Sequence, residues 1–119
     1  STLLASSAAS DVYKRQGKSY VAGITFSGGD PLYRGNRLEV TAFAKELKEK
    51  YPKKTIWLYT GYLWEEIQDL EILSYLDVVV DGKFILEQRD VSLKWKGSTN
   101  QRVVDVKKSL EAGSVVLHD

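Results

Sequence analysis

Apolar residues recur in two patterns along this chain, one typical of buried strands and one of the helices that cover them. Short runs rich in β-branched and aromatic residues predict strands at 21–26, 55–59 and 77–80. Apolar positions at helical spacing predict helices at 37–50 and 63–76. Strand and helix therefore alternate through this part of the chain.

The helix expected at 37–50 has a clear inner side, formed by Val40, Phe43, Ala44 and Leu47. Near the C-terminus a third helix is predicted, with Thr99 or Asn100 as its cap and Val103, Val106 and Leu110 on its inner side. Gly113 would end that helix, and a short strand would follow at 114–117.

Strands that are joined by single helices run parallel and cross over with right-handed connections. We therefore predict an α/β fold built on a parallel sheet with β-α repeats. In such a sheet, ligands bind beyond the carboxyl ends of the strands, where loops and helix N-termini meet.

Composition excludes several classes of function. The 119 residues carry a formal net charge of +1, so no global field attracts nucleic acid or an acidic membrane surface. The sequence contains no cysteine and one histidine, which excludes disulfides, thiolate catalysis and a cysteine-bound metal. No apolar run approaches the roughly 20 residues of a membrane span. A cytoplasmic protein is the expectation.

Residues 1–16 differ from the rest of the chain. The first ten have neither helical nor strand periodicity, and we expect them to be unfolded. Residues 11–16 look like translated sequencing-adapter residues, so 1–16 is interpreted as a non-native or disordered leader before a domain at 17–119. The alternative interpretation is a flexible native tail.

Each predicted strand is followed by glycine beside a hydroxyl or a charge. The three exits are Ser27-Gly28-Gly29-Asp30, Thr60-Gly61-Tyr62 and Asp81-Gly82-Lys83. Glycine lets a ligand lie against backbone, and Asp30 offers an acceptor for a cationic group. At any single exit, glycine turns and helix caps are the usual explanation, because short glycine motifs are weak signals. Three exits on one edge favour a small-molecule site.

Four segments in this order resemble the anaerobic ribonucleoside-triphosphate reductase activating proteins of the radical S-adenosylmethionine (SAM) family. They are residues 23–32, 56–62, 77–84 and 97–102, and the likeness extends from residue 17 to the C-terminus. The family's Cys-x-x-x-Cys-x-x-Cys loop is not found in this sequence. The resemblance thus implies an N-terminally truncated member, the C-terminal part of a radical SAM domain, whose fold is a partial (β/α) barrel lacking its first strand.

The resemblance also implies an activity. In the family, a [4Fe-4S] cluster and SAM generate a glycyl radical on anaerobic ribonucleoside-triphosphate reductase, with an electron donor such as flavodoxin. The reductase is therefore the implied partner, and SAM the implied cofactor. Because this sequence lacks the cluster cysteines, the chain alone is expected to be inactive.

Seven residues are implied to bind the cofactor: Ser27, Gly28, Gly29, Asp30, Thr60, Asp81 and Lys83. The first four would face the methionine end of SAM, where backbone carbonyls and one carboxylate can satisfy an ammonium. Thr60 could hydrogen-bond the ribose or the methionine carboxylate. Lys83 would meet that carboxylate, and Asp81 either Lys83 or the substrate peptide. Without the resemblance, an ordinary surface ion pair would be the preferred interpretation of the last two.

Other features leave their roles open. Trp95, flanked by lysines, marks either a contact with the reductase or a loop tucked over the sheet edge. Ser98, Asn100 and Gln101 either cap a helix or contact SAM or the reductase. No residue has the setting of a general base, which fits chemistry performed by a cofactor. Alternative functions are a small α/β nucleotide-binding or regulatory module without catalysis, and a degenerate activase domain kept for protein contact.

Overall fold

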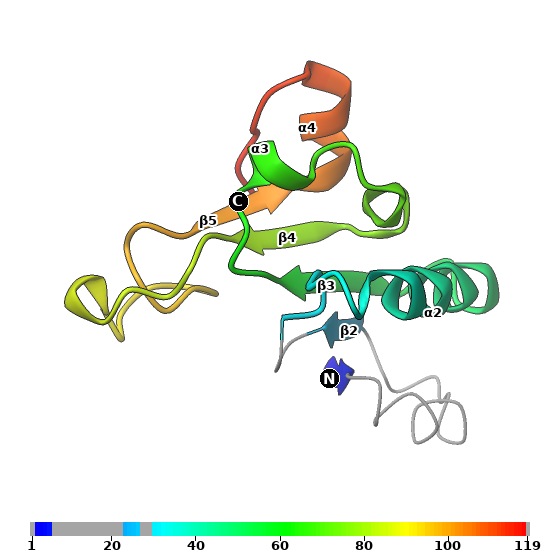
Figure 1. Cartoon of the computed structure of the whole chain (residues 1–119), viewed down its shortest axis with the longest axis horizontal. Helices are drawn as coiled ribbons and strands as arrows, with labels where there is room; N and C mark the ends of the chain where they lie inside the picture. The colour runs from blue at the N-terminus through cyan, green and yellow to red at the C-terminus, as the bar shows by residue number, and fades with distance from the viewer. Residues whose placement is uncertain (1, 6–22, 27–29, 119) are drawn as a thin grey trace.

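The structure is a computed structural model that describes residues 2–5, 23–26 and 30–118. Five strands form one sheet in the order β1-β2-β3-β4-β5 (Figure 1). They are β1 (Thr2–Ala5), β2 (Gly23–Phe26), β3 (Thr55–Tyr59), β4 (Val78–Asp81) and β5 (Arg102–Asp105). The first four run parallel, and β5 is antiparallel to β4. The predicted α/β class is confirmed, whereas the sheet is mixed and not wholly parallel.

The strand β1 differs from the expectation for the start of the chain. Thr2 to Ala5 pair in register with Gly23 to Phe26, so the expectation of no regular structure is wrong for these four residues. The interpretation of 1–16 as a non-native leader stays a prediction, as does the partial barrel of the radical SAM type.

The described residues contain five helical segments. They are α2 (Arg37–Lys50), α3 (Trp64–Ile67), η2 (Glu71–Tyr75), η3 (Leu86–Gln88) and α4 (Val106–Ala112). The bounds and the inner side predicted for α2 are confirmed, since Val40, Phe43, Ala44 and Leu47 are buried. The helix predicted at 63–76 is instead two short pieces, because Leu70 between them has an extended backbone.

The C-terminal helix begins later than predicted. Residues 102–105 form the strand β5, in which Val103 packs with one cluster of core residues and Val104 with another. This alternation is the strand period, and β-branched residues favour it. Asp105 then caps α4, accepting a hydrogen bond from the Lys108 N–H at 3.0 Å. Gly113 ends α4 with a φ of 72°, as predicted.

The strand predicted at 114–117 is reduced to an isolated bridge between Val104 and Leu117. The predicted strand at 77–80 is confirmed with a shift of one residue, as β4 begins at Val78. These differences do not move the carboxyl ends of β2, β3 and β4, which lie at one edge of the sheet because the three strands are parallel.

The two faces of the sheet have different coverings. Buried residues from α2, α3, η2 and α4 share one cluster with the β3 and β4 residues Ile56, Leu58 and Val79. On the opposite face, Val78, Val80 and Val103 pack with Trp57 and Tyr59. The segment between β4 and β5, drawn in yellow, projects beyond the end of β4 (Figure 1). Within the described residues, no helix is long and apolar enough to cross a membrane.

Candidate functional site at the strand exits

A shallow pocket of about 180 Å³ lies beyond the carboxyl ends of β3 and β4. Its lining residues are Asp30, Tyr59, Thr60, Gly61, Gly82, Phe84 and Gln101. The pocket thus contains Asp30 and Thr60, two of the residues predicted to bind a cofactor. Ser27, Gly28 and Gly29, also predicted there, lie outside the described residues.

Asp30 connects the exit of β2 to the exit of β3. Its carboxylate accepts hydrogen bonds from the Thr60 hydroxyl at 2.9 Å and from the Gly61 N–H at 2.8 Å. The Leu32 N–H donates to the same carboxylate at 3.0 Å, which closes a turn after Pro31. Three neutral donors therefore fix the orientation of this side chain.

Among the described residues, the donors to the Asp30 carboxylate leave room for one more. A carboxylate has about four lone-pair positions, and the three donors named above do not fill them all. Asp30 is half-buried at the wall of the pocket, and among the described residues no cation forms an ion pair with it. An external ammonium group would thus meet a negative charge that the fold orients but does not neutralise.

Lys83 approaches the pocket across Gly61. A Cβ atom placed on Gly61 would lie 3.2 Å from Lys83 Cγ and 3.4 Å from Asp30 Oδ2, so the absence of a side chain permits this close approach. Lys83 itself is exposed. The backbone thus turns at Gly82, whose φ is 91°, and brings the Lys83 side chain to the same place as Asp30. The carboxylate of Asp30 and the stem of the Lys83 side chain therefore lie beside one glycine.

Asp81 does not face this pocket. It is fully buried, and it accepts hydrogen bonds from the Trp64 N–H at 2.8 Å and from the Arg102 guanidinium. No ion pair between Asp81 and Lys83 occurs in the described part of the chain. Asp81 therefore holds the start of α3 and the start of β5 together. The Asp-x-Lys spacing places its two side chains in different surroundings, because Gly82 interrupts the strand after Asp81.

Gln101 holds the base of the projecting segment, a role that the sequence did not indicate. Its amide nitrogen donates to the Gly82 carbonyl at 2.9 Å, and its amide oxygen accepts from the Gly97 and Ser98 N–H groups. Ser98 is fully buried and accepts from the Ile85 N–H, while Asn100 donates to the Lys83 carbonyl at 2.8 Å. These side chains do not cap a helix, since a strand follows them.

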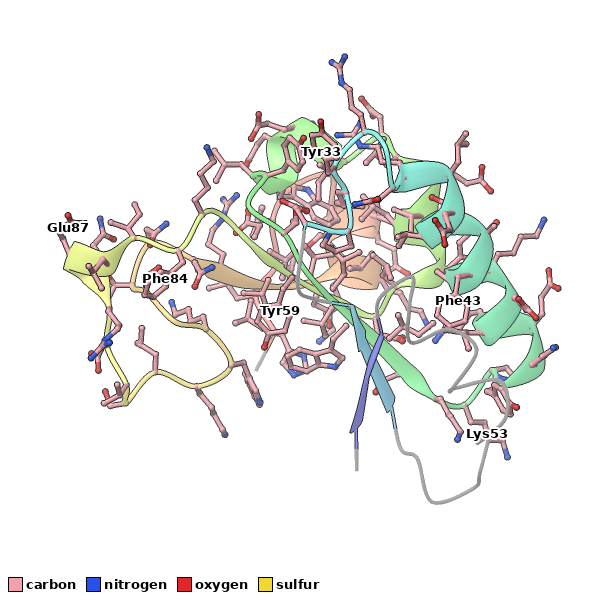
Figure 2. The ribbon with its side chains drawn as sticks, turned by 60° about the horizontal axis from the view of Figure 1, so that its bottom comes forward. Tyr33, Phe43, Lys53, Tyr59, Phe84 and Glu87 are labelled. Atoms are coloured by element: carbon pink, nitrogen blue, oxygen red, sulfur yellow. The ribbon has the colours of Figure 1, made fainter. Side chains whose placement is uncertain are left out.

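Trp95 packs against the molecule itself. Its ring lies 5.5 Å from that of Trp57 and 4.9 Å from that of His118, measured between centroids. Tyr59 donates from its hydroxyl to the Trp95 carbonyl at 2.7 Å, and burial raises the pKa of Tyr59. Trp95 is only 37% exposed. The interpretation of its segment as a loop over the sheet edge therefore fits better than the interpretation of Trp95 as a fully exposed contact for a partner. Figure 2 shows Phe84 and Glu87 farther out on the same segment.

A family profile described as "4Fe-4S single cluster domain" matches residues 1–104. The chain belongs to this family. Its similar relatives are named anaerobic ribonucleoside-triphosphate reductase-activating proteins, as the resemblance predicts. The enterobacteria phage T4 protein is 47% identical over 88 residues, which cover 72% of this chain and 54% of that protein. The Vibrio cholerae protein is 47% identical over 81 residues (66% and 52%), and that of Escherichia coli K12 is 39% identical over 83 residues (68% and 54%).

The chain spans about half the length of the curated relatives that it matches. No solved structure matches it significantly. The family is defined by an iron-sulfur cluster, yet this chain's own residues do not fit one. The sequence has no cysteine, and among the described residues no group of three or more histidines, aspartates or glutamates could hold a metal ion. Any chemistry at the strand-exit pocket must therefore be considered without a cluster on this chain.

Proposed function

We propose that the strand-exit pocket binds the methionine end of SAM, and that the chain is the SAM-binding part of an activating protein for anaerobic ribonucleoside-triphosphate reductase. The observation that supports this most directly is that the Asp30 carboxylate and the stem of the Lys83 side chain lie beside the same glycine, Gly61. An amino acid group carries one ammonium and one carboxylate on the same carbon. The Asp30 carboxylate and the side chain of a lysine beside the same glycine offer the two opposite charges that complement it.

The size of the pocket supports contact with only a part of the SAM molecule. At about 180 Å³, it is smaller than the roughly 300 Å³ at which ligand sites usually begin. It therefore accommodates the methionine portion of SAM and leaves the nucleoside portion outside. Thr60 is occupied by Asp30 and by the Tyr62 N–H at 3.2 Å, so we assign it to the orientation of Asp30. Asp81 is assigned to the fold.

The roles of the chain's own residues are binding and orientation. Asp30 would accept from the ammonium of SAM and Lys83 would donate to its carboxylate, while Gln101 keeps the Gly82 carbonyl and the projecting segment in place. Bound SAM supplies a sulfonium, whose reductive cleavage gives the radical that the resemblance predicts for the whole activating protein. That cleavage needs an electron, which a donor such as flavodoxin would supply, and no cysteine of this sequence could hold the cluster that would pass it on.

Calorimetric titration of SAM into the 119-residue chain tests the site. We expect measurable binding, and a loss of about tenfold in Lys83→Ala, the scale of one charge-assisted hydrogen bond. Lys53→Ala is the matched control, because Lys53 is also exposed but lies at the turn between α2 and β3 (Figure 2). Equal affinities of wild type, Lys83→Ala and Lys53→Ala would contradict the proposed site.

A second experiment tests the expectation that this chain alone does not cleave SAM. Anaerobic reconstitution of the chain with iron and sulfide, followed by iron analysis and visible absorption, should give no stoichiometric cluster, because the sequence supplies no thiolate ligand. SAM cleavage under a strong reductant should then be absent. A stoichiometric cluster on this chain would refute the proposal that it lacks the redox step.

A further inference from the structure

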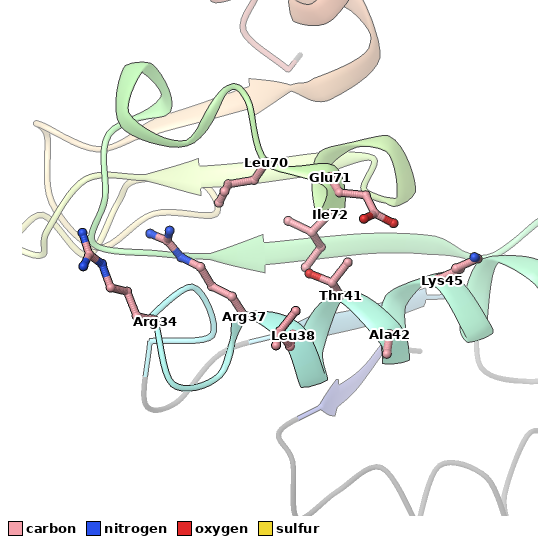
Figure 3. Close-up of a pocket in the computed structure, with 9 residues that line it drawn as sticks. All are labelled: Arg34, Arg37, Leu38, Thr41, Ala42, Lys45, Leu70, Glu71 and Ile72. Atoms are coloured by element: carbon pink, nitrogen blue, oxygen red, sulfur yellow. The ribbon is translucent and has the colours of Figure 1, made fainter.

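A second and larger cavity lies on the helical side of the molecule, between α2 and the segment 70–72. Its volume is about 700 Å³ (Figure 3). We call it the basic groove, and define it by Arg34, Arg37 and Lys45, with Leu38, Leu70 and Glu71 as further lining residues. Nothing in the proposed SAM site uses these side chains.

The charges in the basic groove are unbalanced. Three cations line it against one carboxylate, Glu71, which already accepts from the Tyr75 hydroxyl at 3.0 Å. In the part of the chain that the structure describes, none of the three cations forms an ion pair. Since the whole chain has a net charge of only +1, this is a local concentration of positive charge.

Arg37 is held in place before any ligand arrives. Its Nε donates to the Leu32 carbonyl, and its guanidinium carbon lies 5.3 Å from the centre of the Tyr62 ring. Among the described residues, the two terminal nitrogens of Arg37 have no hydrogen-bond acceptor, so they remain available as donors. A guanidinium fixed in this way binds a carboxylate at a smaller cost in side-chain entropy than a free one.

The groove also exposes apolar surface. Leu38 is 89% exposed beside Arg37, and Leu70 lines the opposite wall. A ligand that complements this groove carries carboxylates for the three cations and an apolar side chain for Leu38. An acidic peptide segment that contains a hydrophobic residue has both features. A small inorganic anion would use the charges and leave the leucines in water.

The position of the groove connects it to the strand-exit pocket. Arg34 follows Asp30 by four residues, and the intervening loop is tied to Asp30, whose carbonyl accepts from the Tyr33 N–H and from the Asn36 side chain. The groove therefore begins beside the pocket and runs along α2. A partner protein that inserted one of its residues into the pocket would therefore also lie over the end of the groove near Arg34.

We propose that the basic groove docks an acidic segment of anaerobic ribonucleoside-triphosphate reductase. This inference rests on the proposed function, which supplies the partner. Electrostatic complementarity would speed association and fix the orientation of the two proteins. The binding of the reductase should therefore weaken as the salt concentration rises.

The test measures the affinity of the immobilised 119-residue chain for purified anaerobic reductase by biolayer interferometry. The double variant Arg34→Glu/Lys45→Glu should bind about tenfold or more weakly, because it reverses two charges of the groove. Neither side chain makes a hydrogen bond recorded for the described residues, so the fold should persist, which a thermal melt checks. Glu71→Gln should bind more tightly, because it removes the single negative charge.

The control is Lys53→Glu/Lys108→Glu, which changes the net charge equally at exposed positions outside the groove. Unchanged binding by this control, together with the two shifts above, would support the groove. If wild type binds the reductase and the groove variants bind equally well, the groove is refuted while the proposed partner stands. If wild type does not bind the reductase at all, the groove proposal and the assignment of the reductase as partner fail, while the SAM site is judged by the calorimetric titration. Displacement of the reductase by inorganic phosphate at constant ionic strength would also overturn the docking proposal.

Discussion

Asp30 follows β2 and Asp81 ends β4, on either side of β3 in the sheet, yet the fold treats their charges in different ways. Asp81 is fully buried and meets the guanidinium of Arg102, so its charge is neutralised within the chain. Asp30 is half-buried and receives only neutral donors from Leu32, Thr60 and Gly61 among the described residues. A carboxylate that the fold orients without a cation is suited to bind one from outside.

The surroundings of Arg102 strengthen this contrast. Its guanidinium contacts Glu65 on α3 as well as Asp81 on β4, and hydrogen bonds from these two carboxylates raise its pKa well above the usual range. Arg102 thus links α3, β4 and β5. Asp81 belongs to a connection that stabilises the fold, and Asp30 to a pocket that is open to ligand.

The largest effect is expected from Asp81→Ala. Removal of this carboxylate leaves Arg102 without its buried partner and the Trp64 N–H without an acceptor, so the free energy of unfolding should fall by about 3 kcal/mol. Urea denaturation measures this loss. The affinity for SAM, measured where the variant is still folded, should be unchanged. A variant that kept its stability and lost SAM binding would reverse the roles assigned to the two aspartates.

Asp30→Asn should have the opposite effects, a large loss of SAM affinity and a small loss of stability. The amide keeps one acceptor oxygen and loses the negative charge, so we expect SAM affinity to fall about tenfold to a hundredfold. The free energy of unfolding should fall by only about 1 kcal/mol, because one of the local hydrogen bonds is lost. Titration calorimetry and urea denaturation on the same sample separate the two effects. Asp69→Asn, an exposed acid outside the pocket, serves as the control.

Local patterns were sufficient to predict the elements with a single period. The helix α2 has four buried residues at helical spacing, and β3 is a compact β-branched and aromatic run. The segment 102–105 was predicted as helix, because Val103 and Val106 also fit a helical spacing. Its pairing with β4 decides the outcome, and that contact joins residues between 21 (Asp81 and Arg102) and 27 (Val78 and Asp105) positions apart, which no local pattern contains.

The same limit applies to the site. The glycine-rich exits indicated an edge with polar groups, and in the structure Asp30, Thr60 and Gly61 are joined there by hydrogen bonds. It was not possible to predict that Asp81 forms its ion pair with Arg102 and not with Lys83, since the sequence contains many cations that could be its partner. Gln101 is a polar residue of the 97–102 motif that was not needed as a helix cap, and this could have drawn attention to it. Its hydrogen bond to the Gly82 carbonyl, however, forms only when the segment between β4 and β5 is folded.

Gly61→Ala should have a moderate effect that isolates the approach of Lys83. The added methyl group would lie 3.2 Å from Lys83 Cγ, and a flexible lysine can move aside with little loss of stability. SAM affinity should therefore fall a fewfold while urea denaturation changes by less than about 0.5 kcal/mol. Gly35→Ala is the matched control, since its added atom meets only the Tyr33 ring at an ordinary 3.5 Å. Equal SAM affinities in both variants would mean that Lys83 does not act across Gly61.

The smallest effect concerns Glu65, the exposed carboxylate that shares Arg102 with Asp81. A hydrogen bond from Arg102 lowers the pKa of Glu65, so its ionised form is favoured in the folded state. The contribution to stability is therefore present above the unfolded pKa of about 4.3 and is lost as the pH falls through the lower folded value. For an exposed pair it should stay below about 1 kcal/mol. The difference in unfolding free energy between wild type and Glu65→Gln should shrink toward zero on acidification, whereas Glu49→Gln, exposed on α2, should show no such trend. A difference near zero at every pH would show that Arg102 is held by Asp81 alone.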